Sequence, residues 1–210
     1  REQNSVDFFR DNIARFSEQK ELIASWQDYT DATLHLLDKA ALPEQPCIVE
    51  LGPGDGSLLP QLARRADKVI ALDNSAVMLE SARSNAAGLD NIMFLMGDTQ
   101  HLALAEQRID AIIANMVLHH TPDPQTTLAT AASLLLPGGV LIISELCAHD
   151  QLWAREHCGD LWLGFAPEQL GQWAKAAGLE SAAEVFIGQR NGFQIQVRLF
   201  IKTVSTGNQV

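Results

Sequence analysis

The sequence predicts an α/β protein with a mostly parallel sheet and helices on both of its faces. Short apolar segments alternate with helical segments between residues 47 and 143, which is typical of successive β–α units. Three apolar segments, 47–51, 68–73 and 91–96, contain or lead into acidic residues and glycine at their ends. Polar residues at three strand ends are hard to explain by packing, so we expect a ligand at this edge of the sheet.

The first apolar segment ends at an acidic residue and breaks into a glycine-rich turn before a short helix, 58–63. The residues of interest in this turn are Glu50, Gly52, Gly54 and Gly56. Glycine lets the backbone turn sharply and lets a ligand lie against it, and the helix offers N–H groups beside the turn. Ser57 occupies the third glycine position of a dinucleotide fingerprint, which favours a nucleoside other than a nicotinamide cofactor. A tight turn that binds nothing is the alternative for this motif alone.

The second apolar segment ends in Asp73. An acidic residue at this place in a doubly wound sheet faces the ligand crevice and can accept hydrogen bonds from both ribose hydroxyls. The alternative role for Asp73 is to cap the helix that starts near Ser75. Because Asn74 and Ser75 can provide that cap equally well, the sequence favours the ribose role.

In order, spacing and residue type, residues 45–146 resemble the class I S-adenosylmethionine-dependent methyltransferases of the type 11 group. The resemblance implies a Rossmann-like fold, with a seven-stranded mostly parallel sheet and a C-terminal antiparallel hairpin. It implies S-adenosylmethionine as cofactor, S-adenosylhomocysteine as product and a small-molecule acceptor. The residues that it assigns to cofactor binding are Glu50, Gly52, Gly54 and Gly56 at the methionine part, Asp73 at the ribose, Asp98 and Thr99 at the adenine, and Asn115 at the amino-acid end. Asn74, next to Asp73, is also a candidate cofactor-binding residue.

The same resemblance places His119 and His120 beside the methyl that is transferred. Histidine titrates near neutral pH and can take a proton from an acceptor, so both are candidate catalytic residues. A pair of loop histidines that is structural or faces solvent is the alternative. The segment 135–143 resembles the helix, Pro-Gly-Gly turn and fifth strand of the family.

A narrower resemblance, in residues 115–124, 149–150 and 156–165, is to methyltransferase domains fused behind ArsR-type transcriptional regulators. It leaves open a second function, in which the chain senses S-adenosylmethionine or S-adenosylhomocysteine for a regulator with a DNA-binding domain ahead of residue 1. A third possibility is another nucleoside-binding α/β protein, such as an oxidoreductase. A homodimer is also left open.

Two further groups of residues have competing interpretations. Cys147, His149, Asp150, His157 and Cys158 match no usual zinc spacing, so we expect no metal. The aromatic residues Trp153, Trp162, Phe165 and Trp173 form either core or the wall of an acceptor pocket.

Composition narrows the class of protein further. The chain has 210 residues, of which 47% are hydrophobic, enough for one domain with a sizeable core. The net charge of −11 disfavours contact between this segment and nucleic acid. No apolar run approaches the roughly 20 residues of a membrane helix, so no membrane contact is expected, and three scattered cysteines fit the cytoplasm.

We expect three parts along the chain. Residues 1–42 form a helical N-terminal lid or oligomer contact, 43–204 form the cofactor-binding domain, and 205–210 form a flexible tail. Within the domain, the segments 183–187 and 193–202 read as the closing hairpin.

Overall fold

The computed structural model describes residues 26–153 and 160–204. The part of the predicted lid within 1–25, the residues His157 and Cys158, and the predicted tail 205–210 lie outside these residues. In chain order the elements are α2 (Trp26–Lys39), β1 (Cys47–Leu51), α3 (Leu59–Ala63), β2 (Lys68–Asp73), α4 (Ala76–Asn85), β3 (Ile92–Met96), α5 (Leu102–Ala105), β4 (Ile109–Asn115), the 3₁₀ helix η1 (Leu118–His120), α6 (Pro124–Leu134), β5 (Leu135–Leu146), α8 (Pro167–Ala176), β6 (Leu179–Gly188) and β7 (Gln194–Lys202).

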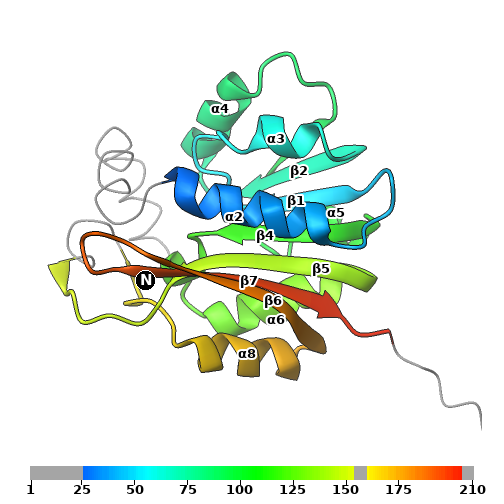
Figure 1. Ribbon diagram of the computed structural model, residues 1–210. Helices are drawn as coiled ribbons and strands as arrows, with labels where there is room; N and C mark the ends of the chain where they lie inside the picture. The colour runs from blue at the N-terminus through cyan, green and yellow to red at the C-terminus, as the bar shows by residue number, and fades with distance from the viewer. Residues whose placement is uncertain (1–25, 154–159, 205–210) are drawn as a thin grey trace, which may run out of the picture.

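In the described part of the chain, seven strands form one sheet in the order β3-β2-β1-β4-β5-β7-β6 (Figure 1). β1 to β5 pair in parallel, whereas β7 lies antiparallel between β5 and β6. The predicted α/β fold with its closing hairpin is therefore confirmed. The hairpin is longer than its apolar pattern indicates, because β6 already begins at Leu179, directly after Gly178.

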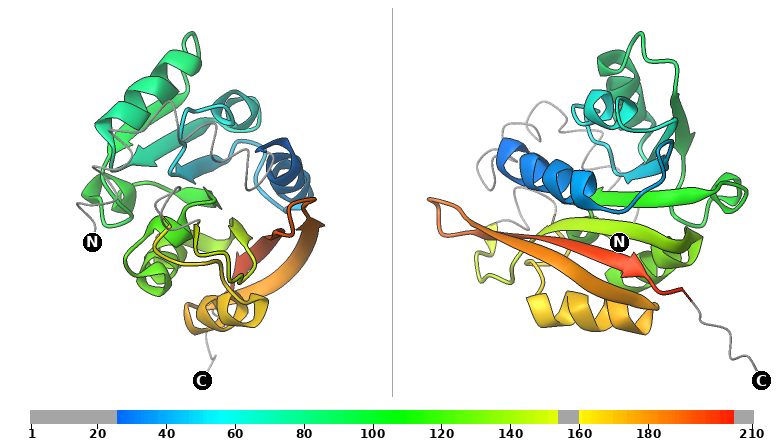
Figure 2. Two further views of the ribbon diagram at one scale, coloured as in Figure 1. Left: turned by 90° about the vertical axis from the view of Figure 1, so that its left-hand side faces the viewer. Right: turned by 45° about the vertical axis from the view of Figure 1, so that its right-hand side comes forward.

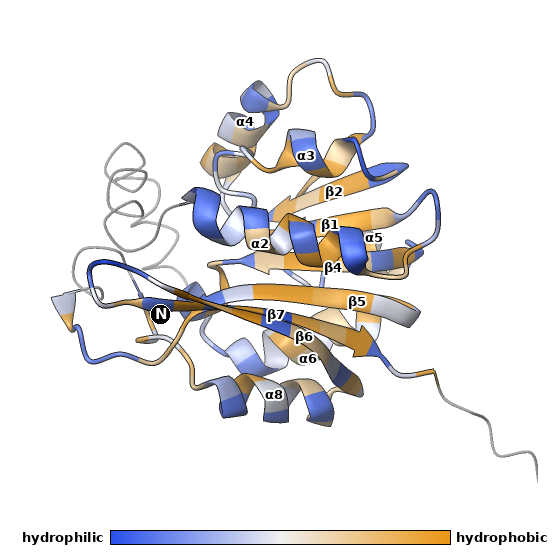
Figure 3. Cartoon of the chain, viewed as in Figure 1, coloured by the Kyte–Doolittle hydropathy of each residue, from blue (hydrophilic) through white to orange (hydrophobic). Residues whose placement is uncertain are grey.

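The central strands are apolar along their length because helices cover both faces of the sheet. Ile48 and Val49 are neighbours in β1, are both fully buried, and point into different cores. The first core includes residues of α2, α3 and α4, and the second includes residues of α6 and α8. Figure 2 shows the helices on the two sides of the sheet, and Figure 3 shows the hydrophobic strands between them.

α2 is the described part of the predicted N-terminal lid. It packs on the sheet through Tyr29, Leu34, Leu36 and Leu37, which are buried in the first core. Burial of a full apolar face on the strands makes α2 a structural layer of the domain. Among the described residues, no helix is both long and apolar enough to cross a membrane.

The predicted Pro-Gly-Gly turn lies inside β5. The strand pairs Leu135 with Ile109, and its next pair joins Val140 to Ala111, so residues 136–139 bulge out of the ladder. Gly138 has a φ of +81° there. The bulge ends before the strand enters the core, where Leu141, Ile142 and Ile143 are almost fully buried.

The order of the strands determines where a ligand can bind. The chain proceeds from β1 outward to β2 and β3, and then returns to the other side of β1 to form β4. Loops that leave β1 and β4 at their carboxyl ends therefore diverge in opposite directions, and an open sheet of this kind has its crevice there. The glycine-rich turn and the two histidines follow these two strands.

Candidate functional site

A cavity of about 300 Å³ lies at the carboxyl ends of β1 to β4. Its apolar walls include Leu72, Met78 and Val117, and its polar groups come from the turns that follow the strands. Asp123, also on the cavity wall, caps α6 and accepts a hydrogen bond from Thr126 N, which lowers the pKa of this carboxyl group. A cleft with apolar walls and a few polar groups at its edge is typical of sites for small organic ligands.

The glycine-rich turn lines the cavity through Gly52 and Gly54. Gly52 has a φ of +60°, and a Cβ on it would lie 2.8 Å from Cγ2 of Val117. Only glycine allows β1 to turn this close to the segment after β4. Gly56 has a different role, because a Cβ there would lie 2.7 Å from Cα of Ala82 in α4. The structure thus places Gly56 against a helix and outside the cavity lining, while Glu50 is buried at the end of β1.

Asp73 lies on the cavity wall at the end of β2, together with Asn74. Its Oδ1 accepts a hydrogen bond of 2.8 Å from Ser75 N. Ser75 is the N-cap of α4, and its hydroxyl accepts from Met78 N. Ser75 therefore caps α4, which was the alternative role for Asp73.

Asp98 and Thr99 line the cavity beyond β3. Asp98 is exposed, and its Oδ1 accepts a hydrogen bond from Gln100 N, whereas Thr99 is buried. The turn is joined to β2 through Gly97, whose N–H donates to the carbonyl of Asp73. This bond brings the ends of β2 and β3 together on one side of the cavity.

Asn115 ends β4 and is tied to α2. Thr33 donates from its hydroxyl to Asn115 Oδ1 at 2.9 Å, and Ser144 lies 2.9 Å from the same hydroxyl. Among the described residues, the buried Nδ2 of Asn115 has no hydrogen-bond partner. A buried amide donor without a partner costs free energy, which makes this nitrogen a candidate donor to a ligand. Asn115 is not part of the cavity lining itself.

Met116 follows β4, and its backbone conformation is a feature that the sequence did not indicate. Its φ is +56°, the one positive value among the described non-glycine residues, and it lines the cavity. Its N–H donates to the carbonyl of Ser144 in β5 at 2.8 Å. Left-handed backbone at a residue with a long side chain costs about 1–2 kcal/mol, and such strain is concentrated at functional sites.

The two adjacent histidines lie in different surroundings. His120 lines the cavity, whereas His119 lies behind it with a side chain 5% exposed. His119 Nδ1 donates to Oε2 of Glu145 at 2.7 Å, and Oε1 of Glu145 accepts from Leu118 N at 2.6 Å. Of the two candidate catalytic residues, His120 is the one that can contact a ligand in the cavity.

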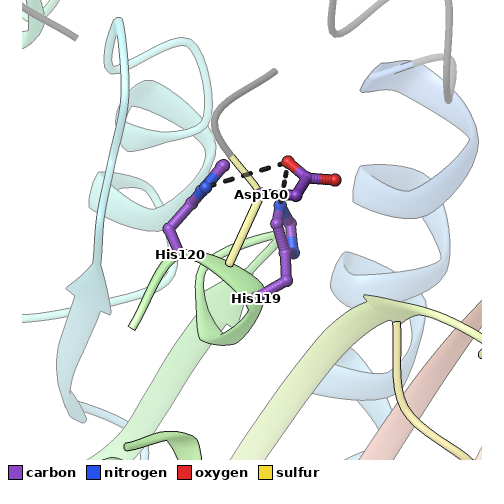
Figure 4. Close-up of side chains that lie close together, drawn as sticks. All are labelled: His119, His120 and Asp160. Carbon is purple, nitrogen blue, oxygen red and sulfur yellow. Dashed lines mark ion pairs between the residues drawn. The ribbon is translucent and has the colours of Figure 1, made fainter. Parts of the chain in front are cut away.

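Glu145 and Asp160 are two buried acidic residues that sequence reasoning missed. Glu145 lies in the apolar strand β5, and Asp160 is the first described residue after 153. Figure 4 shows that the rings of His119 and His120 both point toward the Asp160 carboxylate. His119 Nε2 lies 3.8 Å and His120 Nδ1 lies 3.9 Å from its Oδ1. An aspartate in a loop is common in any sequence, so nothing around Asp160 indicated that it would lie next to the two histidines.

The residues tested for zinc spacing are not brought together as one metal cluster in the described part of the chain, where His157 and Cys158 are not included. Burial raises the pKa of the Cys147 thiol, which disfavours the thiolate that metals bind. Burial also lowers the pKa of His149, whose ring lies against Phe193.

The four aromatic residues are not part of the cavity lining. Phe165 is fully buried and has its ring 5.7 Å from that of Trp173, in the second core. Trp153 packs against the ring of Phe193. Trp162 is 38% exposed and donates from its indole to the carbonyl of Thr121. These contacts favour the core interpretation for Phe165, Trp173 and Trp153.

The sheet order, the closing hairpin and the glycine-lined cavity define the Rossmann-like fold of class I methyltransferases. Residues 49–143 match the family model described as a methyltransferase domain. This match covers β1 to β5 up to Ile143, and therefore includes the elements whose carboxyl ends surround the cavity.

Two curated relatives are also named as methyltransferases. An uncharacterized methyltransferase of Mycobacterium tuberculosis is 34% identical over 116 residues, which are 54% of this chain and 58% of that protein. Trans-aconitate 2-methyltransferase of Deinococcus radiodurans is 38% identical over 116 residues, which are 53% of this chain and 43% of that protein. The chain spans about half the length of these relatives.

Among solved structures, the N-methyltransferase NodS of Bradyrhizobium japonicum, in complex with S-adenosyl-L-homocysteine, superposes with a TM-score of 0.77. The likeness covers 95% of this chain and 98% of NodS at 18% identity. At this identity the comparison establishes the fold, and it extends the likeness beyond the matched domain to the closing hairpin.

Proposed function

We propose that the chain transfers a methyl group from S-adenosylmethionine to a small-molecule acceptor. The observation that carries this proposal is the cavity at the carboxyl ends of β1 to β4, with Gly52, Asp73 and Thr99 on its wall. These are three of the positions that the sequence motifs assign to the cofactor. The matched methyltransferase domain and the S-adenosylhomocysteine complex of NodS support the same cofactor.

The residues at the cavity suit this cofactor. The apolar side chains of Leu72 and Met78 lie beside the carboxylates of Asp73 and Asp98, which gives a flat base an apolar surface and gives ribose hydroxyls an acceptor. Nδ2 of Asn115, which has no partner among the described residues and lies next in the chain to the lining residue Met116, is the proposed donor to the amino-acid end. When bound, S-adenosylmethionine supplies an electrophilic methyl on a sulfonium, which leaves as a neutral sulfide.

The chain's own contribution to such a transfer is largely placement. Holding two reactants in line at short distance accounts for several kcal/mol of a barrier. His120 and Val117 lie on the cavity wall after β4, on the opposite side from Asp98. An acceptor bound next to His120 would face the methyl group, and His119 would act behind it as a positioning residue through its bond to Glu145.

The acceptor proposed is a small oxygen-containing molecule. The Deinococcus relative is a trans-aconitate 2-methyltransferase, so carboxylates and hydroxyls are the groups to screen first. The likeness to ArsR-fused domains, an upstream DNA-binding domain and a homodimer stay predictions, because the matches described above do not test them.

A calorimetric titration with S-adenosylmethionine and S-adenosylhomocysteine tests the cofactor. We expect micromolar binding of both, followed by formation of S-adenosylhomocysteine in the presence of an acceptor from a panel that includes trans-aconitate. No binding of either at millimolar ligand would overturn the proposal. A preference for S-adenosylhomocysteine of 100-fold or more, about 2.7 kcal/mol, without turnover would favour a sensor over an enzyme.

A further inference from the structure

We propose that His119, His120 and Asp160 form a site for one divalent transition-metal cation at the edge of the cavity. Their ligand atoms, two imidazole nitrogens and one carboxylate oxygen, lie within 4.8 Å of one another. Figure 4 shows the two rings converging on the same side of the carboxylate. Two imidazoles and a carboxylate are a donor set that suits Zn²⁺, Fe²⁺, Co²⁺ or Mn²⁺.

The distances favour an ion between the groups over direct hydrogen bonds. His119 Nε2 and His120 Nδ1 lie 3.8 and 3.9 Å from Asp160 Oδ1, beyond the reach of a hydrogen bond. Ligand atoms on one Zn²⁺ lie roughly 3.3–3.6 Å apart, from metal–ligand distances near 2.0–2.2 Å and a tetrahedral angle. Each histidine nitrogen therefore needs to approach Oδ1 of Asp160 by about 0.2–0.6 Å to hold the ion. Ligand atoms of the cluster that lie up to 4.8 Å apart need to close by up to about 1.2–1.5 Å.

The fold keeps these three side chains in place without an ion. η1 turns His119 and His120 to the same side, with ring centroids 4.1 Å apart. The carbonyl of His119 accepts hydrogen bonds from Leu161 N at 2.9 Å and Trp162 N at 3.2 Å. These bonds hold Asp160 against η1, so residues 40 positions apart share one cluster because of the tertiary structure.

Glu145 provides the outer support that is common in metal sites. It accepts from His119 Nδ1 and has no exposed side-chain surface. A carboxylate on the far nitrogen of a ligating histidine sets the tautomer, so that the nitrogen that faces Asp160, here Nε2, is the one that would bind the metal. This arrangement gives a physical reason for an acidic residue inside the apolar strand β5.

The site is half closed and half open. The side chains of His119 and Asp160 are 5% and 1% exposed, whereas His120 is 13% exposed and lines the cavity. Three protein ligands leave at least one position of the metal for another molecule, as in catalytic sites. On the basis of the proposed function, this open position would bind an oxygen of the methyl acceptor.

The test is a titration of the tag-free, chelator-treated chain with Zn²⁺, followed by calorimetry, and with Co²⁺, followed by visible absorption. We expect one binding site, which is weakened in each site variant and kept in its matched control. Asp160→Asn and His120→Gln should each weaken Zn²⁺ binding by about 100-fold or more, and Glu145→Gln by about 10–100-fold. The controls Asp90→Asn and His35→Gln replace exposed residues and should bind Zn²⁺ like the native chain.

Circular dichroism of each variant confirms that it is folded. Equal Zn²⁺ affinity of the native chain, Asp160→Asn and His120→Gln would overturn the proposal, as would the absence of any Co²⁺ absorption band in the native chain. The same preparation is titrated with S-adenosylmethionine. Cofactor binding without Zn²⁺ binding would overturn only the metal site, and the reverse result would overturn only the proposed function.

Discussion

The two sides of the cavity hold their polar groups in different ways. The β1–β3 side consists of the turns that follow these strands. There, Asp73 and Asp98 each accept a hydrogen bond from the backbone N–H group two residues further along. The β4–β5 side consists of the ends of those strands and the segment that begins at residue 160. There, His119 is held by a hydrogen bond to Glu145, 26 positions away. The first side is made of local turns, and the second of contacts between distant parts of the chain.

This difference predicts how each side responds to substitution. A polar group in an exposed turn can exchange its partner for water at little cost, so its removal should affect ligand binding more than folding. A buried charge cannot do this, and removal of its partner leaves it without compensation.

His119→Ala should lower the free energy of unfolding by about 3–5 kcal/mol, because it leaves the buried carboxylate of Glu145 without its partner. His120→Ala, one residue further along, should cost less than about 1.5 kcal/mol, because its ring borders the cavity. Urea unfolding of both variants, with chelator present, measures the difference. Equal losses would show that the two histidines do not differ as their burial indicates.

Gly56→Ala should lower the free energy of unfolding by about 2–4 kcal/mol. The new Cβ would meet the backbone of Ala82, and the φ of +80° disfavours any side chain. Gly88→Ala is the matched control, because its φ is +88° and nothing lies within 4 Å of its Cβ. A loss equal to that of Gly88→Ala would contradict the close packing of the glycine-rich turn on α4.

Asp73→Ala should weaken S-adenosylmethionine binding by about 1–3 kcal/mol, the scale of a lost charged hydrogen-bond acceptor. Calorimetry of the folded variant measures it. Asp90→Ala, an exposed acidic residue outside the cavity lining, is the control. Unchanged affinity for the cofactor in Asp73→Ala would remove this residue from the proposed site.

The smallest effect is expected from an ion pair between α2 and the end of α3. Arg65 donates to both carboxylate oxygens of Asp38, at 2.6 and 3.0 Å, and this lowers the pKa of Asp38 below 3.8. Because protonation is harder in the folded state, the pair stabilises the fold above that pH, and the benefit is lost as the pH falls through the lowered pKa.

The contribution of this pair should stay below about 1 kcal/mol, since Asp38 is half exposed. Urea unfolding of Asp38→Asn at neutral pH and near about pH 3 should show a smaller pH dependence than the native chain. Asp31→Asn, also exposed on α2, should behave like the native chain. The same pH dependence of stability in Asp38→Asn and the native chain would contradict the lowered pKa of Asp38.

The β1–β3 side could be predicted from the sequence in some detail. The apolar segments 68–73 and 91–96 became the strands β2 and β3 within one residue of their predicted bounds, and Gly52, Asp73 and Asp98 line the cavity that follows them. These features depend on turn chemistry and strand periodicity, which act over a few residues. The exception is Gly56, whose neighbour Ala82 could not be read from the turn.

The β4–β5 side shows what such reasoning misses. The pair His119-His120 was visible, but nothing in it indicated that one ring is buried and the other borders the cavity. Glu145 looks like an interruption of an apolar strand until the structure places it under His119. The left-handed backbone of Met116 is equally invisible in the sequence, because methionine has no preference for that conformation.

From the sequence alone follow the α/β fold, the strand edge at which the cavity lies and the residues of its turns, since these depend on apolar periodicity and on local backbone preferences. The tertiary structure alone decided which histidine reaches the cavity, and it alone brought Asp160 to within 4 Å of both rings. The physical reason is sequence distance. Contacts between residues 26 or 40 positions apart are formed by the packing of β5 and the segment 160–165 on η1, and no local pattern encodes them.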